Sequence, residues 1–213
     1  PIDRSRRPER QHDRLGGAAV PLHVLIETHG ALADVRAIAA HPRIESLSFG
    51  LMDFVSAHRG AIPASAMGAK GQFEHPLVVR AKLEIAAACH AHAKAPSHCV
   101  VTEFKNKRAL MDAATAACRQ LGYTRMWSIH PDQVRVIVDA FTPSVAEVDQ
   151  AIEIIMAAQA AQWAPIRHHD TLHDRASYRY FWHVIERAAR TGYALPGERA
   201  QPFRLKGPAV ESI

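Results

Sequence analysis

Residues 22–30 read LHVLIETHG, and residues 44–54 read IESLSFGLMDF. Each stretch is a short apolar run that leads to a carboxylate, Glu27 in the first and Asp53 in the second. If both runs are strands of one parallel sheet, the two acids meet at its carboxyl edge, where α/β folds place their ligands. A few carboxylate oxygens with room for water suit Mg²⁺ better than Zn²⁺, so this edge predicts a hard-cation site. The alternative is that both acids only cap helices.

An alternation of strands and helices continues along the chain. The apolar patterns predict strands at 22–27, 44–49, 99–102 and 124–129, and helices at 31–40, from Pro76, at 108–121, up to Phe141 and from Val145. Ser144 and Glu147 have the spacing of a capping box at the start of the last of these helices. The four βα units predict a parallel α/β fold.

Four units are half of what a closed TIM (β/α)₈ barrel needs, since such a barrel has eight strands in about 250 residues. We therefore predict an irregular lead-in at 1–20, the carboxy-terminal half of a TIM-barrel domain at 21–163 and a helical extension at 164–213. A half-barrel would expose an unpaired strand edge and an apolar inner face. Association of copies, by pairing of half-barrels or as a trimer, is therefore expected.

Composition limits the functional classes. The chain has 213 residues, 48% of them hydrophobic, and a formal net charge of +5. It contains neither an apolar run of membrane-span length nor a secretory signal, which predicts a cytoplasmic protein without a membrane partner. Without a basic stripe interleaved with aromatic residues, nucleic acid is not expected as a partner. Cys89, Cys99 and Cys118 have no metal or redox spacing and are predicted to be reduced and buried.

Three short segments together resemble a known family. They are ETHG at 27–30, FGLMDF at 49–54 and SIHPDQV at 128–134, each at the end of a predicted strand. In this order they are similar to the signatures of the HpcH/HpaI aldolase and citrate lyase β-subunit superfamily, over roughly residues 21–192. The resemblance implies a TIM-barrel lyase that cleaves or forms a carbon–carbon bond of a β-hydroxy acyl compound. It also implies that Glu27 and Asp53 hold Mg²⁺.

The resemblance suggests further site residues. Asp174 lies where similar CoA lyases carry a general acid or base on a segment that covers a neighbouring subunit, although an Asp just before a helix is also an ordinary N-cap. His130 and Gln133 belong to the third signature and are expected to line the substrate pocket or support it. The substrate would be an α-keto or hydroxy acid, or an acyl-CoA thioester. His168-His169-Asp170 lacks helical ligand spacing and predicts a solvated turn.

Two departures from the family affect the expected activity. The family's arginine that grips the substrate carboxylate would lie upstream of Pro1, and His29 stands where the family commonly has a proline, which changes the stiffness of the loop beside Glu27. Three functions remain open: a Mg²⁺-dependent carbon–carbon lyase, a non-catalytic or truncated fragment or subunit of such a lyase, and an acyl-CoA thioester hydrolase on the same scaffold.

Overall fold

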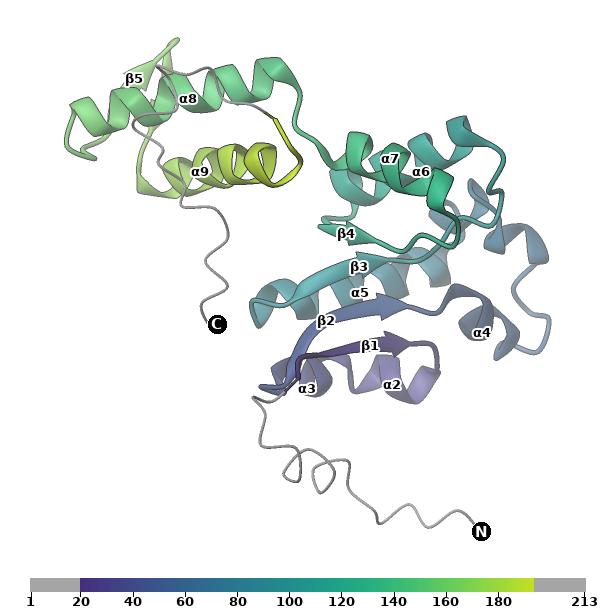
Figure 1. Ribbon diagram of the computed structural model, residues 1–213. Coiled ribbons are helices and arrows are strands. Elements are labelled where there is room, and N and C mark those ends of the chain that lie inside the picture. The colour runs from purple at the N-terminus through teal and green to yellow at the C-terminus, as the bar shows by residue number, and fades with distance from the viewer. Residues whose placement is uncertain (1–19, 194–213) are drawn as a thin grey trace. The chain divides into compact units, whose positions relative to one another are not determined.

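The computed structural model describes residues 20–193 (Figure 1). They fall into two compact units, one up to Ile137 and the other from Val138. The predicted lead-in, apart from Val20, lies outside the described residues, as does the end of the predicted extension. The predicted domain boundary at 163 stays a prediction, while the division into compact units falls earlier in the chain.

The first unit is built on a parallel sheet whose strands alternate with helices. The strands are hydrogen-bonded in chain order: β1 (Leu22–Ile26), β2 (Ile44–Phe49), β3 (Ala95–His98) and β4 (Arg125–Met126). Between and after them run α2 (His29–Ala33), α3 (Val35–Ala40), α4 (Leu51–Ser56), the short 3₁₀ helices η2 (Ala64–Met67) and η3 (Gly71–Phe73), α5 (Pro76–Ala91), α6 (Lys107–Gln120) and α7 (Pro131–Phe141). The division between the two units falls within α7. The predicted parallel α/β class is confirmed, whereas closure into a barrel stays a prediction.

Three predicted elements were wrong in place or extent. The third strand is β3, before the apolar run at 99–102, because Ala95, Pro96 and Ser97 are the residues that pair with β2. The predicted helix at 31–40 is broken at Asp34, which ends α2 and begins α3. The fourth strand is only the two residues of β4, since the following residues turn away into a loop.

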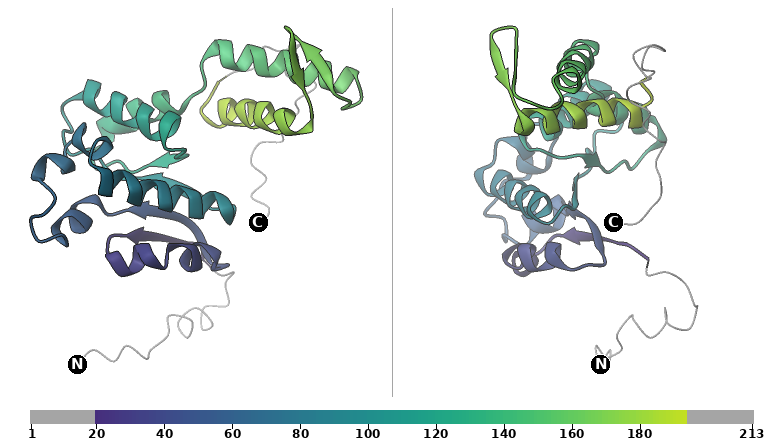
Figure 2. Two further views of the ribbon diagram at one scale, coloured as in Figure 1. Left: turned by 180° about the vertical axis from the view of Figure 1, so that it is seen from behind. Right: turned by 90° about the vertical axis from the view of Figure 1, so that its left-hand side faces the viewer.

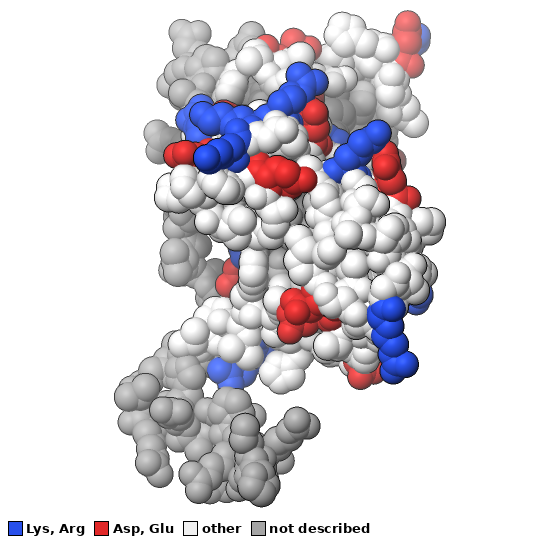
Figure 3. Space-filling model, turned by 90° about the vertical axis from the view of Figure 1, so that its right-hand side faces the viewer, with Lys and Arg blue, Asp and Glu red and all other residues white. Residues whose placement is uncertain are grey.

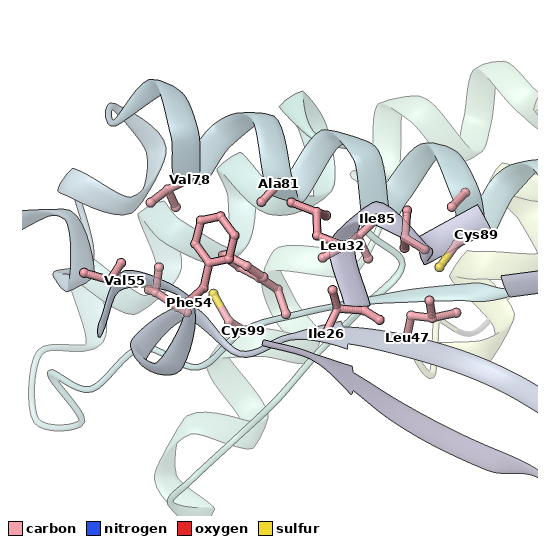
Figure 4. Close-up of a cluster of buried hydrophobic side chains, with 14 of the residues drawn as sticks. Ile26, Leu32, Leu47, Phe54, Val55, Val78, Ala81, Ile85, Cys89 and Cys99 are labelled. Carbon is pink, nitrogen blue, oxygen red and sulfur yellow. The ribbon is translucent and has the colours of Figure 1, made fainter. Parts of the chain in front are cut away.

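Helix α5 supplies much of the core of the first unit. Pro76 occupies its first turn, as predicted. The helix packs on one face of the sheet, in contact with β2 and β3 (Figure 2). Figure 4 shows its apolar face directed at side chains of the strands and of α2 and α4: Val78, Ala81, Ile85 and Cys89 face Ile26, Leu32, Leu47 and Phe54. Each large buried apolar side chain stabilises the fold by about 1.5–3 kcal/mol.

The other face of the sheet carries more polar side chains. Side chains alternate along a strand, so Leu47 and Phe49 face the core while Ser46 and Ser48 face the opposite way, with Ser97 beside them. These serines are buried, and Ser48 Oγ donates a hydrogen bond to the carbonyl of Ser97 at 2.9 Å. Ser46 Oγ is hydrogen-bonded to Nδ1 of His23 on β1, and Leu25 lies beside Ser48 on the same face. The predicted apolar inner face therefore stays a prediction, because the described part of this face is mixed and mainly polar.

The cysteines are free thiols, but only two of them are buried as predicted. Cys89 and Cys99 lie in the core, whereas Cys118 on α6 is half-buried. Burial raises the pKa of the Cys89 thiol to about 11 and raises the pKa of Cys99 as well. Both core thiols are therefore protonated packing residues at neutral pH.

The second unit is a pair of packed helices with a small hairpin. Helix α8 (Val145–Ala160) begins with the predicted capping box of Ser144 and Glu147. The antiparallel strands β5 (Ile166–His168) and β6 (Thr171–His173) lead into α9 (Arg175–Arg190), which packs along α8 (Figure 1). The core between the two helices consists chiefly of Ile152, Ile155, Tyr178, Val184 and Ile185.

Charges of both signs are interspersed over the surface. Figure 3 shows basic and acidic side chains next to one another on the face in view. Several are pairs one helical turn apart: Lys70 with Glu74, Arg80 with Glu84 and Arg108 with Asp112. Exposed pairs of this kind contribute only a few tenths of a kcal/mol each. Among residues 20–193, no helix is long and apolar enough to cross a membrane.

A buried lysine interrupts the apolar core. Lys82 on α5 is 0% exposed, and its Nζ donates to Gln72 Oε1 at 2.7 Å and lies 4.2 Å from the centre of the Phe73 ring. The Sγ of Cys99 also donates to Gln72 Oε1, at 3.1 Å. Burial lowers the pKa of Lys82 to about 8, against a smaller opposing effect of Cys99. The charged form is thus held in the core at a cost in stability.

Replacing this lysine should change how stability depends on pH. Between pH 8 and the ordinary lysine pKa of 10.5, Lys82 is protonated in the unfolded chain but deprotonated in the folded protein. The free energy of unfolding of wild type therefore increases as the pH rises through this range. From pH 7 to pH 10.5, we expect the free energy of unfolding of wild type to increase by about 3 kcal/mol relative to that of Lys82→Met. Urea denaturation of both proteins across this range measures the difference, and a constant difference would contradict the prediction.

Candidate functional site

The two predicted metal ligands lie at adjoining strand ends. Glu27 follows β1 directly, and Asp53 lies in the first turn of α4, which follows β2. Strands β1 and β2 are parallel with Ile26 opposite Phe49, and the N–H of Gly50 donates to the carbonyl of Ile26 at 2.8 Å. The pairing therefore extends to the edge from which both carboxylates leave the sheet.

Gly50 is the residue that allows this arrangement, and sequence reasoning missed its role. A Cβ at position 50 would lie 2.4 Å from Cβ of Glu27 and 3.0 Å from its Oε2. Gly50 has φ of −83°, so the requirement is space and not an unusual backbone angle. The signal was present in the second signature as the glycine between the strand and the aspartate.

The donor set fits a hard divalent cation. Glu27 is half-buried and Asp53 is exposed, so the site has carboxylate oxygens with open access for water and substrate oxygens. The missing Cβ of Gly50 lets the chain after β2 pass close beside the side chain of Glu27. Thr28 belongs to the scaffold, because its Oγ1 accepts the N–H of Ala31 and caps α2.

His29 joins α2 to α4 through an aromatic cluster. Its ring centre lies 5.1 Å from that of Phe54 and 4.4 Å from that of His58. His58 in turn is hydrogen-bonded through Nδ1 to the carbonyl of Phe54 at 2.7 Å. This packing connects the loop beside Glu27 to the helix that carries Asp53.

Gln133 ties two loops together at the carboxyl edge. It is 1% exposed, its Nε2 donates to the carbonyl of Val101 at 2.9 Å and its Oε1 accepts the N–H of Ile129 at 2.9 Å. The loop after β3 is thereby fixed to the loop after β4. His130 is partly exposed, stacks on Phe104 at 5.5 Å between ring centres and accepts the N–H of Asp132 through Nδ1 at 3.2 Å. A substrate role for His130 and Gln133 stays a prediction.

Asp174 lies in the second unit and caps α9. Its Oδ1 accepts the N–H of Ala176 at 2.9 Å, and Ser177 Oγ receives the N–H of Asp174 at 3.1 Å, which completes a capping box. The capping alternative considered for this residue is thus present in the structure. Its catalytic role stays a prediction. Capping does not exclude that role, because the carboxylate is exposed and its second oxygen is available.

His168 and His169 are less isolated than the sequence indicated. His169 and Asp170 do form the turn of the β5–β6 hairpin, but the two imidazoles lie beside Glu153 of α8. Sequence reasoning missed Glu153, because a helix residue fifteen positions away carries no local signal for a site in a turn.

Comparisons with known proteins agree with the signatures. The chain is 30% identical over 156 residues to the L-malyl-CoA/β-methylmalyl-CoA lyase of Rhodobacter capsulatus, covering 67% of this chain and 48% of that protein. It is 28% identical over 144 residues to the (3S)-malyl-CoA thioesterase of Cereibacter sphaeroides, with shares of 67% and 47%. The chain thus spans about half the length of the curated relatives it matches.

Solved structures give the same result. The fold superimposes on a citrate lyase from Burkholderia xenovorans LB400 with a TM-score of 0.81 and 57% identity, over 92% of this chain and 61% of that one. It also matches the CitE protein of Mycobacterium tuberculosis in complex with magnesium, acetoacetate and coenzyme A, with a TM-score of 0.66 over 85% and 73% of the two chains. At 18% identity this second likeness shows the fold alone. Residues 4–131 match the HpcH/HpaI aldolase/citrate lyase family, and the chain belongs to that family.

Proposed function

We propose that this chain is the metal-binding part of a Mg²⁺-dependent carbon–carbon lyase that acts on a β-hydroxy acyl-CoA thioester or a related hydroxy acid. The observation that carries the proposal is the placement of Glu27 and Asp53 at the adjoining ends of β1 and β2, with Gly50 allowing the close approach of the two chain segments. The malyl-CoA lyase relatives support the reaction and the thioester substrate. The magnesium-containing neighbour supports the choice of cation.

Glu27 and Asp53 would hold the cation from two different elements. Glu27 is fixed by its place directly after β1, which is paired with β2, whereas Asp53 is carried by a helix and faces solvent. When bound, Mg²⁺ supplies positive charge where negative charge develops on substrate oxygens during cleavage, an effect worth several kcal/mol. Gln133 would set the wall of the pocket by joining the two neighbouring loops, and His130 would line it.

Asp174 is the proposed general acid or base for the acyl methyl group. The family resemblance supports this role, together with the exposure of its carboxylate at the start of α9. The carboxylate would take a proton from the methyl carbon in the synthetic direction and return it in the cleavage direction.

Thioester hydrolysis is the second candidate. The match to a malyl-CoA thioesterase favours it specifically, since that relative covers the same share of this chain as the lyase does. The two activities differ in their products. A lyase breaks the carbon–carbon bond and leaves the thioester intact, whereas a thioesterase releases free CoA and keeps the carbon skeleton.

Homo-oligomer formation is part of the proposal. Among residues 20–193, β1 stands at one edge of the sheet and has β2 as its only strand partner. An unpaired parallel edge favours contact with another chain. Light scattering on the purified protein tests whether it forms oligomers, and a compact monomer would contradict this part of the proposal.

Removing one of the two carboxylates should weaken Mg²⁺ binding without unfolding the chain. We expect Asp53→Asn to bind Mg²⁺ at least tenfold more weakly by isothermal titration, because half of the charged donors are lost. Its thermal stability should match wild type, since Asp53 is exposed and leaves no cavity. Glyoxylate or pyruvate in the titration should strengthen binding to wild type, because a keto acid adds oxygen ligands.

Two further variants sharpen this experiment. Asp112→Asn changes an equally exposed carboxylate on α6 and should bind Mg²⁺ as wild type does. Gly50→Ala should lose affinity although it removes no ligand, because its Cβ would push Glu27 aside. Unchanged Mg²⁺ affinity in Asp53→Asn would overturn the site. If the site holds, free CoA formed from malyl-CoA without glyoxylate would replace the lyase proposal by the thioesterase.

The two possible roles of Asp174 can be separated by a pair of variants. Serine caps helices well, so Asp174→Ser should keep wild-type stability, while Asp174→Ala should lose about 1 kcal/mol. If Asp174 transfers a proton, both variants should lose cleavage activity at least 100-fold. Chemical denaturation and steady-state kinetics give the two readouts. Full activity in Asp174→Ser would show that the residue is only a cap.

A further inference from the structure

The hairpin of the second unit has an unusual turn. His169 and Asp170 both have positive φ, +45° and +60°, which is the left-handed region that residues with a side chain rarely adopt. The side chain of Asp170 pairs with Arg167 across the turn. Such conformations persist where the surroundings hold them, and they are concentrated at functional sites.

The turn brings two neighbouring imidazoles together. Consecutive residues of a strand point to opposite faces, yet the ring centres of His168 and His169 are only 4.2 Å apart. Both rings also approach one carboxylate of α8. Nε2 of His168 lies 3.5 Å, and Nε2 of His169 4.0 Å, from Oε2 of Glu153.

These three side chains have the chemistry of a transition-metal site. One ligand atom from each lies within 4.8 Å of the others. Donors bound to a single Zn²⁺ at about 2.1 Å stand roughly 3.4 Å apart in a tetrahedron, so a shift of about 1 Å in exposed side chains would close the site. Two imidazoles and one carboxylate are a common donor set for Zn²⁺, unlike the all-carboxylate pair of Glu27 and Asp53.

A third imidazole lies close by, and one of its nitrogens lacks a hydrogen-bond partner in the described part of the chain. His173 on β6 is 7% exposed, and its Nδ1 has no hydrogen-bond partner in the described part of the chain. The ring centre of His173 lies 6.3 Å from that of His168, on the same face of the hairpin. A buried imidazole nitrogen without a partner costs stability, and a nearby cation or its bound water would satisfy it.

We propose that Glu153, His168 and His169 bind a divalent transition metal of the Zn²⁺ type. The ion would connect the hairpin to α8 through three protein ligands. At least one coordination position would remain for water, on the side of the site where His173 lies. This site is separate from the proposed Mg²⁺ site, because all of its ligands belong to the second unit.

Titration of the full chain with Zn²⁺ in excess Mg²⁺ tests the proposal. Wild type should bind one equivalent of Zn²⁺ with micromolar or tighter affinity, and its melting temperature should rise with Zn²⁺. His169→Asn removes the imidazole but tolerates the left-handed turn, and Glu153→Gln removes only the charge. Both variants should lose at least tenfold in affinity. Bound Co²⁺ should show the strong visible absorption of a low-coordinate site in wild type only.

A matched control is needed because the chain has 14 histidines. His183→Asn changes an exposed histidine of α9 whose Nδ1 lies 2.9 Å from Glu186, so it removes a similar His–Glu pair outside the site. This variant should bind Zn²⁺ as wild type does. Equal binding by wild type and His169→Asn, or the same loss in His183→Asn, would overturn the proposal. If Glu153→Gln fails to fold by circular dichroism, His169→Asn decides.

Discussion

The exit of β2 passes so close to Glu27 that position 50 cannot carry a side chain, and the candidate site depends on that contact. Parallel pairing with Ile26 opposite Phe49 brings the two chain segments together, and the N–H of Gly50 prolongs the pairing by one bond. Helix α4 starts at once after this glycine, which fixes where Asp53 leaves the sheet. The position of Asp53 therefore depends on the close contact between Gly50 and Glu27.

The two faces of the sheet are stabilised by different interactions. On one face, α5 buries an apolar stripe against β2 and β3, and this face can carry the cost of a buried Lys82 with its single carboxamide partner. On the other face, the Ser48 hydroxyl bonds to the carbonyl of Ser97 and Ser46 Oγ is hydrogen-bonded to His23. The apolar face thus provides most of the packing, while the polar side chains lie on the opposite face.

Sequence reasoning located the elements that have strong local patterns. β1 and β2 are alternating or apolar runs that precede the two carboxylates, and the capping box at Ser144 marks the start of α8 without ambiguity. It failed at β3, because Pro96 and His98 interrupt the apolar pattern and only pairing with β2 makes them a strand. Gly50 and Glu153 were missed for a related reason. Their roles depend on what approaches them from elsewhere in the fold.

The row of serines has a thermodynamic consequence. The heat capacity of unfolding follows mainly the apolar surface that becomes hydrated, about 0.45 cal/mol/K per Å², while polar surface contributes with the opposite sign. Ser46, Ser48 and Ser97 present little apolar surface, so their own burial changes this quantity only slightly. Calorimetry of the protein would therefore report mainly on the packing of α5 and of the α8–α9 pair, and only slightly on the burial of these three serines.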